Sequence, residues 1–147
     1  MMNKIIFLDI DGVVTSSKSR YAFSKECFDA LGRILDETGA KIVISSSWRW
    51  DNDVARTIKS LTDSSHMLVG DNPFPFPEKI IGVTPRIGER GIEIACYLES
   101  HPCDRFAILD DDEFDILKYY EKNFFHIDSN FGLTEDDADR IIKFLNE

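Results

Sequence analysis

Residues 4–14, Lys-Ile-Ile-Phe-Leu-Asp-Ile-Asp-Gly-Val-Val, decide the fold of this 147-residue chain. An uninterrupted apolar run that ends in acidic residues is typical of a strand buried on both faces of a parallel sheet. Asp9 and Asp11 stand two residues apart, so their side chains point to one face for as long as the strand persists. Gly12 allows the backbone to turn tightly directly after them. The stretch therefore predicts a buried strand with carboxylates at its carboxyl end.

The rest of the chain alternates between apolar strands and amphipathic helices. We expect further strands at 41–45, 105–109 and 124–127, and a weaker one at 66–69. Helices are expected at 24–38, about 51–61, about 90–100 and 134–145, and another follows the acidic turn after 109 and runs through Tyr120. Ser24 is the expected N-cap of the first helix and Gly39 its stop, and Asp51 or Asn52 is expected to cap the second. Thr134 begins the last helix, with Asp137 three residues on. This alternation predicts an α/β, Rossmann-like parallel sheet with helices on both faces, formed by a single domain over residues 1–147.

Composition and charge exclude several classes of function. The 17 Lys and Arg against 27 Asp and Glu give a net charge of -10 and an isoelectric point near 4.7. Such a chain repels a nucleic-acid backbone, so no strong general nucleic-acid binding is expected and any such role needs a local basic patch. No apolar run approaches the ~20 residues that span a bilayer, so no membrane partner is expected. The chain opens without a signal-peptide core, and its three cysteines include no Cys-x-x-Cys pair, which favours a reduced, cytoplasmic setting.

Polar residues follow three of the predicted buried strands. They are Asp9 and Asp11, then Ser45, and then Asp110 and Asp111. Ligands of open parallel sheets bind at the carboxyl ends of the strands, where these residues meet. Carboxylates gathered in one crevice repel one another unless a hard divalent cation holds them, and Mg²⁺ is the expected ion. The plainer interpretation, helix caps and solvated turns, suits the acids at 112–115 better than Asp9 and Asp11.

Three segments resemble motifs of the haloacid dehalogenase (HAD) superfamily of phosphohydrolases. Asp-Ile-Asp-Gly-Val at 9–13 resembles the first motif, the apolar run ending in Ser45 resembles the second, and residues 106–111 resemble the fourth. The stretch Ile-Ser-Ser-Ser-Trp-Arg at 44–49 is similar to small phosphatase-like members, including those within RNA-repair proteins. The likeness covers nearly the whole chain, with the motifs in the expected order.

The resemblance implies Mg²⁺-dependent phosphomonoester phosphatase chemistry. Asp9 would be the nucleophile that forms an aspartyl-phosphate. Asp11 would act first as general acid and then as base, with its backbone carbonyl on the metal. Asp110 would complete the Mg²⁺ site with Asp9, while Asp111 would bind through water or orient the other ligands. An acid at the second position of the first motif favours phosphatases over the dehalogenases and ATPases of the superfamily.

The resemblance also implies a set of phosphate-binding residues. Ser45 would hydrogen-bond a phosphoryl oxygen, with Ser46 as the alternative if the strand runs one residue longer. The basic residue of the third motif is Arg90 or Arg86, of which Arg90 directly precedes the 91–100 helix. Arg49 could also reach the strand ends and grip a substrate phosphate. Each has a plainer alternative, because serines often cap turns and a lone Arg usually lies on the solvated surface.

The spacing between motifs leaves no room for a sizeable cap domain. Asp11 and Ser45 have only 33 residues between them, which a loop and one helix fill. An open crevice suits a phosphate on a macromolecular end, a small phosphomonoester such as a nucleotide, or a site closed by a second subunit. The Phe-Pro-rich loop at 72–77 either covers the site or packs its rings on its own domain. A nucleotidase or polynucleotide 3'-phosphatase is therefore the alternative within enzymes, and a non-catalytic phosphate- or metal-binding module is the alternative outside them.

Overall fold

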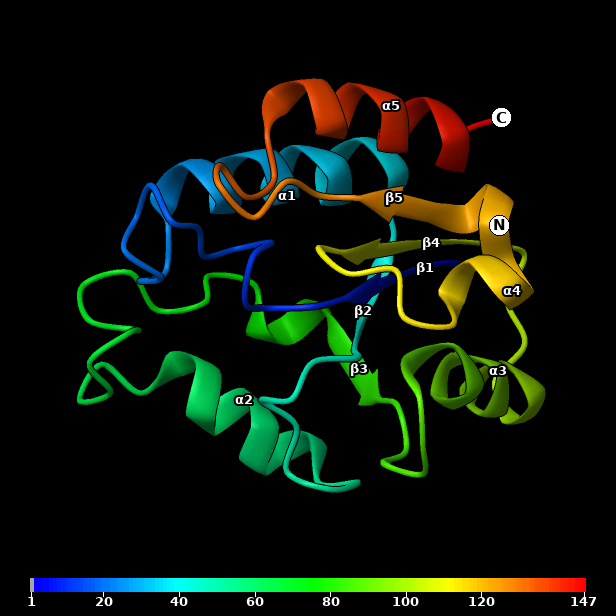
Figure 1. The fold of residues 1–147 in the computed structure, drawn as a ribbon, viewed down its shortest axis with the longest axis horizontal. Helices are drawn as coiled ribbons and strands as arrows, with labels where there is room; N and C mark the ends of the chain where they lie inside the picture. The colour runs from blue at the N-terminus through cyan, green and yellow to red at the C-terminus, as the bar shows by residue number, and fades with distance from the viewer. Residues whose placement is uncertain (1) are drawn as a thin grey trace.

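A computed structural model describes residues 2–147 of the chain. Its centre is a five-stranded parallel sheet in the order β3-β2-β1-β4-β5 (Figure 1). The strands are β1 (Lys4–Leu8), β2 (Lys41–Ile44), β3 (Ile80–Val83), β4 (Arg105–Asp110) and β5 (Phe124–His126). The predicted α/β, Rossmann-like parallel architecture is confirmed.

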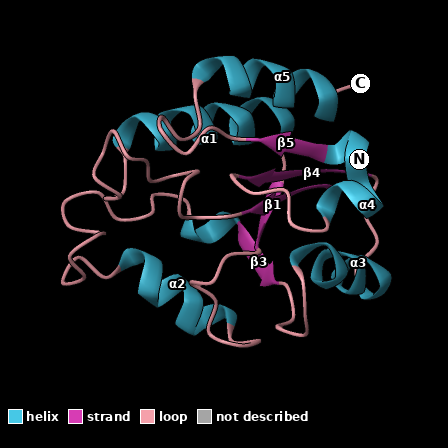
Figure 2. Cartoon of the chain, viewed as in Figure 1, coloured by secondary structure: helices cyan, strands magenta, loops and turns pink. Residues whose placement is uncertain are grey.

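Helices cover both faces of the sheet (Figure 2). They are α1 (Lys25–Thr38), α2 (Val54–Thr62), α3 (Arg90–Ser100), α4 (Ile116–Tyr120) and α5 (Glu135–Leu145), with short 3₁₀ turns η1 (Pro77–Lys79) and η2 (Glu121–Asn123). Helices α1 and α5 pack together over one face, and α3 packs with α4 over the other. Within residues 2–147 the connections between the strands hold these elements and loops but no cap domain, as the motif spacing predicts. None of the helices described there is long and apolar enough to cross a membrane.

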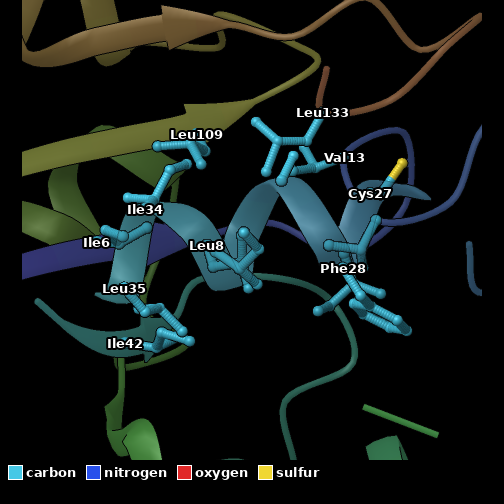
Figure 3. Close-up of a cluster of buried hydrophobic side chains, with 14 of the residues drawn as sticks. Ile6, Leu8, Val13, Cys27, Phe28, Ile34, Leu35, Ile42, Leu109 and Leu133 are labelled. Atoms are coloured by element: carbon cyan, nitrogen blue, oxygen red, sulfur yellow. The ribbon is translucent and has the colours of Figure 1, made fainter. Parts of the chain in front are cut away.

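Strand β1 contributes alternate residues to two separate cores. Ile6 and Leu8 face α1 and lie in the larger core, together with Ile34 of that helix (Figure 3). Ile5 and Phe7 face the opposite way and pack in the smaller core beneath α3 and α4. Burial on both faces explains why the run at 4–8 is continuously apolar rather than alternating.

Local signals fix the ends of the first and last helices. The Ser24 side chain accepts a hydrogen bond from the backbone N–H of Cys27, and Gly39 ends α1 in the left-handed region at φ +72°. Thr134 and Asp137 form a reciprocal capping box at the start of α5. These predicted caps are confirmed, whereas α2 begins one to two residues later than expected, with Asp53 as its N-cap.

Strand β3 lies at a different place in the sequence from the weak strand predicted at 66–69. Residues 66–69 form turns, in which the backbone N–H groups of Val69 and Gly70 donate to the His66 carbonyl. Strand β3, Ile80–Val83, instead occupies the edge of the sheet beside β2. It is only four residues long and contains Gly82, where a side chain would collide with the Tyr97 hydroxyl. A short edge strand with a glycine carries little strand signal in sequence.

The loop at 71–77 packs one of its two phenylalanines into the core. Phe74 is buried and meets Phe28 of α1 edge to face, with 5.6 Å between the ring centroids. Phe76 packs against Phe74 in turn, at 6.0 Å between centroids. Of the two interpretations of this loop, packing on its own domain is confirmed.

Candidate active site

Parallel pairing of β1 with β4 brings two acids together at the carboxyl ends of these strands. Leu8 is in register with Leu109, and the Asp9 N–H donates to the Leu109 carbonyl at 3.0 Å. The next residue of each strand segment is an acid, Asp9 or Asp110, and both are buried. Carboxylate oxygens of Asp9, Asp110 and the neighbouring Asp111 all lie within 4.8 Å of one another. Three residues predicted from the sequence are thus in one cluster.

Arg90, the first residue of α3, lies against the buried acids. Its Nη1 is 2.6 Å from Asp110 Oδ2 and 3.2 Å from Asp9 Oδ1. Arg86, the other candidate for this position, instead donates to the backbone carbonyl of Arg49 at 2.8 Å. The structure therefore places Arg90, and not Arg86, beside the carboxylates.

One guanidinium does not compensate this much buried negative charge. Burial, followed by the charge of Asp110, raises the pKa of Asp9 to about 9, although Arg90 acts in the opposite direction. Burial also raises the pKa of Asp110 to about 6, again against the effect of Arg90. Both acids in ionised form require further positive charge. The three carboxylates of the cluster could therefore hold a cation in addition to Arg90.

The backbone after β1 makes room for Asp111. Gly12 has φ +84°, and a Cβ atom at this position would overlap the Asp111 carboxylate. The glycine is needed both for the turn and for this close approach. A larger residue would displace Asp111 from the cluster.

Asp11 lies apart from the three clustered carboxylates. Strand β1 ends at Leu8, and the chain then turns, with the Val13 and Val14 N–H groups donating to the Ile10 carbonyl. The alternation expected to place Asp9 and Asp11 on one face therefore does not extend to them: Asp9 is buried and Asp11 is exposed. The Asp11 Oδ2 accepts a hydrogen bond from the indole Nε1 of Trp48 at 3.2 Å, which fixes the carboxylate at the mouth of the site.

The two serines after β2 differ in their hydrogen bonding. Ser45 follows β2 directly, and its N–H donates to the Leu8 carbonyl at 3.0 Å. Its buried Oγ has no hydrogen-bond partner among residues 2–147. The Ser46 hydroxyl, by contrast, accepts a hydrogen bond from the Trp48 N–H at 3.2 Å and so supports the turn. An orphaned buried hydroxyl costs free energy unless a ligand supplies its partner, which favours Ser45 over Ser46 as a phosphate contact.

Residues 5–138 match the family described as the HAD domain in Swiss Army Knife RNA repair proteins. The chain belongs to this family. No curated protein matches it, and no solved structure does.

Arg49 of this HAD domain, which was also expected at the site, is buried among partners of the protein itself. Its Nη2 pairs with Glu93 Oε1 at 3.1 Å, both side chains being buried. Its Nε donates to the Ser46 carbonyl at 2.7 Å, and its Nη1 donates to Thr84 Oγ1 at 2.6 Å. These partners do not favour the expected contact between Arg49 and a substrate phosphate, because its donors bond the segments that follow β2 and β3 and helix α3. A buried guanidinium needs such partners, and they leave it committed to the protein.

Three residues of the HAD domain that the sequence did not single out support the site. Trp48 holds Asp11, and Glu93 neutralises Arg49. Asp115 accepts from the N–H groups of the second and third residues of α3, at 2.5 and 3.1 Å, and so caps the helix that begins with Arg90. Each acts through a contact between distant segments, and no spacing pattern reveals it. Trp48 alone had a local signal, its place four residues beyond a strand that ends at the site.

Proposed function

We propose that this chain is a Mg²⁺-dependent phosphomonoester phosphatase that works through an aspartyl-phosphate on Asp9. The observation that carries the proposal is the buried cluster of Asp9, Asp110 and Asp111 with Arg90 against it. Membership of the HAD domain family supports a hydrolase of this kind. The exposed Asp11 next to a buried Asp9 supports two different roles for the two acids of the first motif.

The cluster fits a magnesium ion. Three carboxylates supply hard oxygen donors within 4.8 Å of one another, and the raised pKa values of Asp9 and Asp110 mark a deficit of positive charge. Asp9, Asp110 and Asp111 would hold the ion, together with the backbone carbonyl of Asp11. Bound there, Mg²⁺ would supply charge neutralisation for the carboxylates and for the phosphoryl oxygens.

Asp9 and Asp11 divide the reaction into two steps. An Asp9 carboxylate oxygen attacks phosphorus, the bond from phosphorus to the ester oxygen breaks, and Asp11 gives its proton to that oxygen as the alcohol leaves. In the second step Asp11 takes a proton from a water molecule, which attacks the phosphorus. The bond between phosphorus and Asp9 then breaks, and inorganic phosphate and free Asp9 result. The indole N–H of Trp48 holds Asp11 in place for both transfers.

Arg90 and Ser45 act on the phosphoryl oxygens. Arg90 lies between the nucleophile and Asp110, where its charge faces an incoming phosphate. The Ser45 hydroxyl, which lacks a partner within residues 2–147, has a donor hydrogen to give to a phosphoryl oxygen. These contacts strengthen as charge develops on the transferred group, which is the condition for catalysis.

A terminal phosphate of RNA is the substrate favoured by the family description. The matched family is named for RNA repair proteins. A broken RNA strand can carry a phosphate at its end, and we propose this phosphate as the one that is hydrolysed. The absence of a cap domain within residues 2–147 leaves the site open to a polynucleotide end, such as a 3'-phosphate. A nucleotidase would use the same residues on a smaller ester.

Phosphate release from a panel of esters tests the proposal. The panel contains an aryl phosphate, mononucleotides, phosphosugars, and 3'- and 5'-phosphorylated oligonucleotides, each assayed with Mg²⁺ and with a chelator. We expect Mg²⁺-dependent turnover that falls by at least about a hundredfold in Asp9→Asn. Turnover within about tenfold of wild type in that variant contradicts the nucleophile assignment. Binding of Mg²⁺ and inorganic phosphate without any turnover supports the non-catalytic module instead.

A further inference from the structure

A hollow lined by Trp48, the residue that donates to Asp11, has no role in the chemistry derived above. It measures about 450 Å³ and is walled chiefly by Trp48, Trp50, His66 and Arg86. Trp48 also donates to Asp11, the proposed acid for the leaving oxygen, so the hollow and this acid share one residue.

Trp48 is a fixed wall of the hollow. Its ring lies between two other rings, with centroids 5.3 Å from Phe23 and 5.0 Å from His66. Together with the bond from its Nε1 to Asp11, these contacts hold the indole in one orientation. The wall and the acid therefore keep a constant position relative to each other.

Trp50 offers an open aromatic face. Its side chain is 45% exposed, and its Nε1 donates to Ser60 Oγ at 3.1 Å. The Arg56 guanidinium lies over the ring, 4.0 Å from its centroid. Arg56 lines a second hollow of about 290 Å³, which shares the wall of Trp50, Ser60 and His66 with the first. Trp50 lines both hollows, whereas Arg56 lines the second and not the first, so Arg56 leaves the ring accessible from the first hollow.

The charged residues that line the two hollows are mostly basic although the chain as a whole is acidic. Arg86 lines the first hollow, and Arg56 and Lys59 line the second, where Asp63 is the one acid among the lining residues. All three basic side chains belong to exposed residues. A ring held rigid between an arginine and an open face, with further cations on both sides, is the arrangement that stacks a base and attracts its phosphates. It supplies the local basic patch that a protein of net charge -10 needs for a nucleic-acid ligand.

We infer that the hollow between Trp48, Trp50 and Arg86 is a subsite for the terminal nucleoside of a phosphorylated nucleotide or polynucleotide end. Its base would stack on the free face of Trp50, with its sugar toward Asp11 and any further phosphates near Arg86. The inference deepens the proposed function and rests on it for the direction of the substrate. In both ligands, the nucleotide and the polynucleotide end, a nucleobase lies one sugar away from the phosphate that is hydrolysed.

Three substrates distinguish the contribution of the base to kcat/KM from that of the phosphate. We compare kcat/KM for ribose 5-phosphate, a nucleoside monophosphate and a 3'-phosphorylated oligonucleotide, the last two distinguishing a free nucleotide from a polymer end. Stacking on one indole predicts a preference of about tenfold or more for a substrate that carries a base. Trp50→Ala should reduce this preference to about twofold or less, and Trp50→Phe should keep most of it because a stacking face remains.

Tyr119→Ala is the matched control. Tyr119 is also a half-exposed aromatic residue with a cation, Lys118, over its ring, but it lies on α4 and lines neither hollow. The preference for a base should be unchanged in this variant. Wild-type enzyme that hydrolyses ribose 5-phosphate as well as nucleotides, or an unchanged preference in both Trp50 variants, overturns the subsite. So does a phosphopeptide that is hydrolysed better than the nucleotides.

A binding measurement separates failure of the subsite from failure of the proposed function. If no ester is hydrolysed, the phosphatase proposal fails, and the subsite is then tested with an oligonucleotide that ends in a free 3'-hydroxyl. Saturable binding by fluorescence anisotropy that weakens about tenfold in Trp50→Ala, and not in Tyr119→Ala, keeps the subsite. Equal binding by all variants, or none, rejects it.

Discussion

Replacing the buried nucleophile should stabilise the protein in the absence of a divalent cation. Asp9 retains its proton up to about pH 9 in the folded chain, whereas its ordinary pKa is 3.8. Between these values the folded state holds a proton that the unfolded state lacks, so the free energy of unfolding falls as pH rises through this window and levels off above about pH 9. Each pH unit from 3.8 to neutrality costs about 1.4 kcal/mol, which sets an upper limit of about 4 kcal/mol at pH 7. Asp9→Asn removes this penalty.

Urea unfolding with a chelator and with Mg²⁺ measures the effect. We expect Asp9→Asn to exceed wild type by up to about 4 kcal/mol without the cation, with a flatter dependence on pH. Adding Mg²⁺ should stabilise the wild type more than the variant, and more at higher pH, because the ion binds the ionised carboxylates. Asp36→Asn, at an exposed position of α1, is the control and should change little. If Asp9→Asn is instead less stable than wild type in chelator, burial does not raise the pKa of Asp9 and the argument for a cation fails.

Three further substitutions probe the groups around the cluster. Ser45→Ala deletes an orphaned hydroxyl, so unfolding free energy should hold or rise by about 1 kcal/mol while kcat/KM falls about tenfold or more; a loss of stability would show that the hydroxyl has a partner in the protein. Arg49→Ala strips Glu93 of its buried partner and should cost about 3–5 kcal/mol in urea unfolding. If Arg49→Ala keeps its stability but loses affinity for phosphate, Arg49 contacts the substrate phosphate after all. Asp115→Ala uncaps α3 and should cost about 0.5–2 kcal/mol, with a fall in kcat because Arg90 begins that helix; unaltered kcat would separate the cap from the site.

The parts of the site that follow from a local pattern in the sequence were predictable. Asp9 and Asp110 each follow a run of apolar residues, and parallel pairing of adjacent strands then brings them together without further information. Helix ends were predictable for the same reason, since Ser24 and Gly39 act within one turn of the chain. The position of β3 was not, because a four-residue edge strand with a glycine depends on its neighbours for its structure.

The roles of the arginines could not be separated from sequence. Arg49, Arg86 and Arg90 are each a single basic residue near a strand end, and only the place of Arg90 directly before the 91–100 helix favours it over Arg86. The tertiary structure distinguishes them by their partners. Arg49 forms a buried ion pair with Glu93, and Arg90 forms ion pairs with the buried Asp9 and Asp110. The same limit applies to Trp50, whose open face is defined by Arg56 and Ser60 of the following helix.

The central claim is that Asp9 carries the phosphoryl group during turnover, and a rapid-quench experiment tests it most directly. Enzyme is mixed with Mg²⁺ and a substrate labelled in its phosphate, quenched in acid, and digested for peptide mass spectrometry. We predict a hydroxylamine-sensitive acyl phosphate on the peptide that contains Asp9, absent from Asp9→Asn and from samples with chelator. Turnover without any labelled peptide, or a label on another residue, contradicts the account.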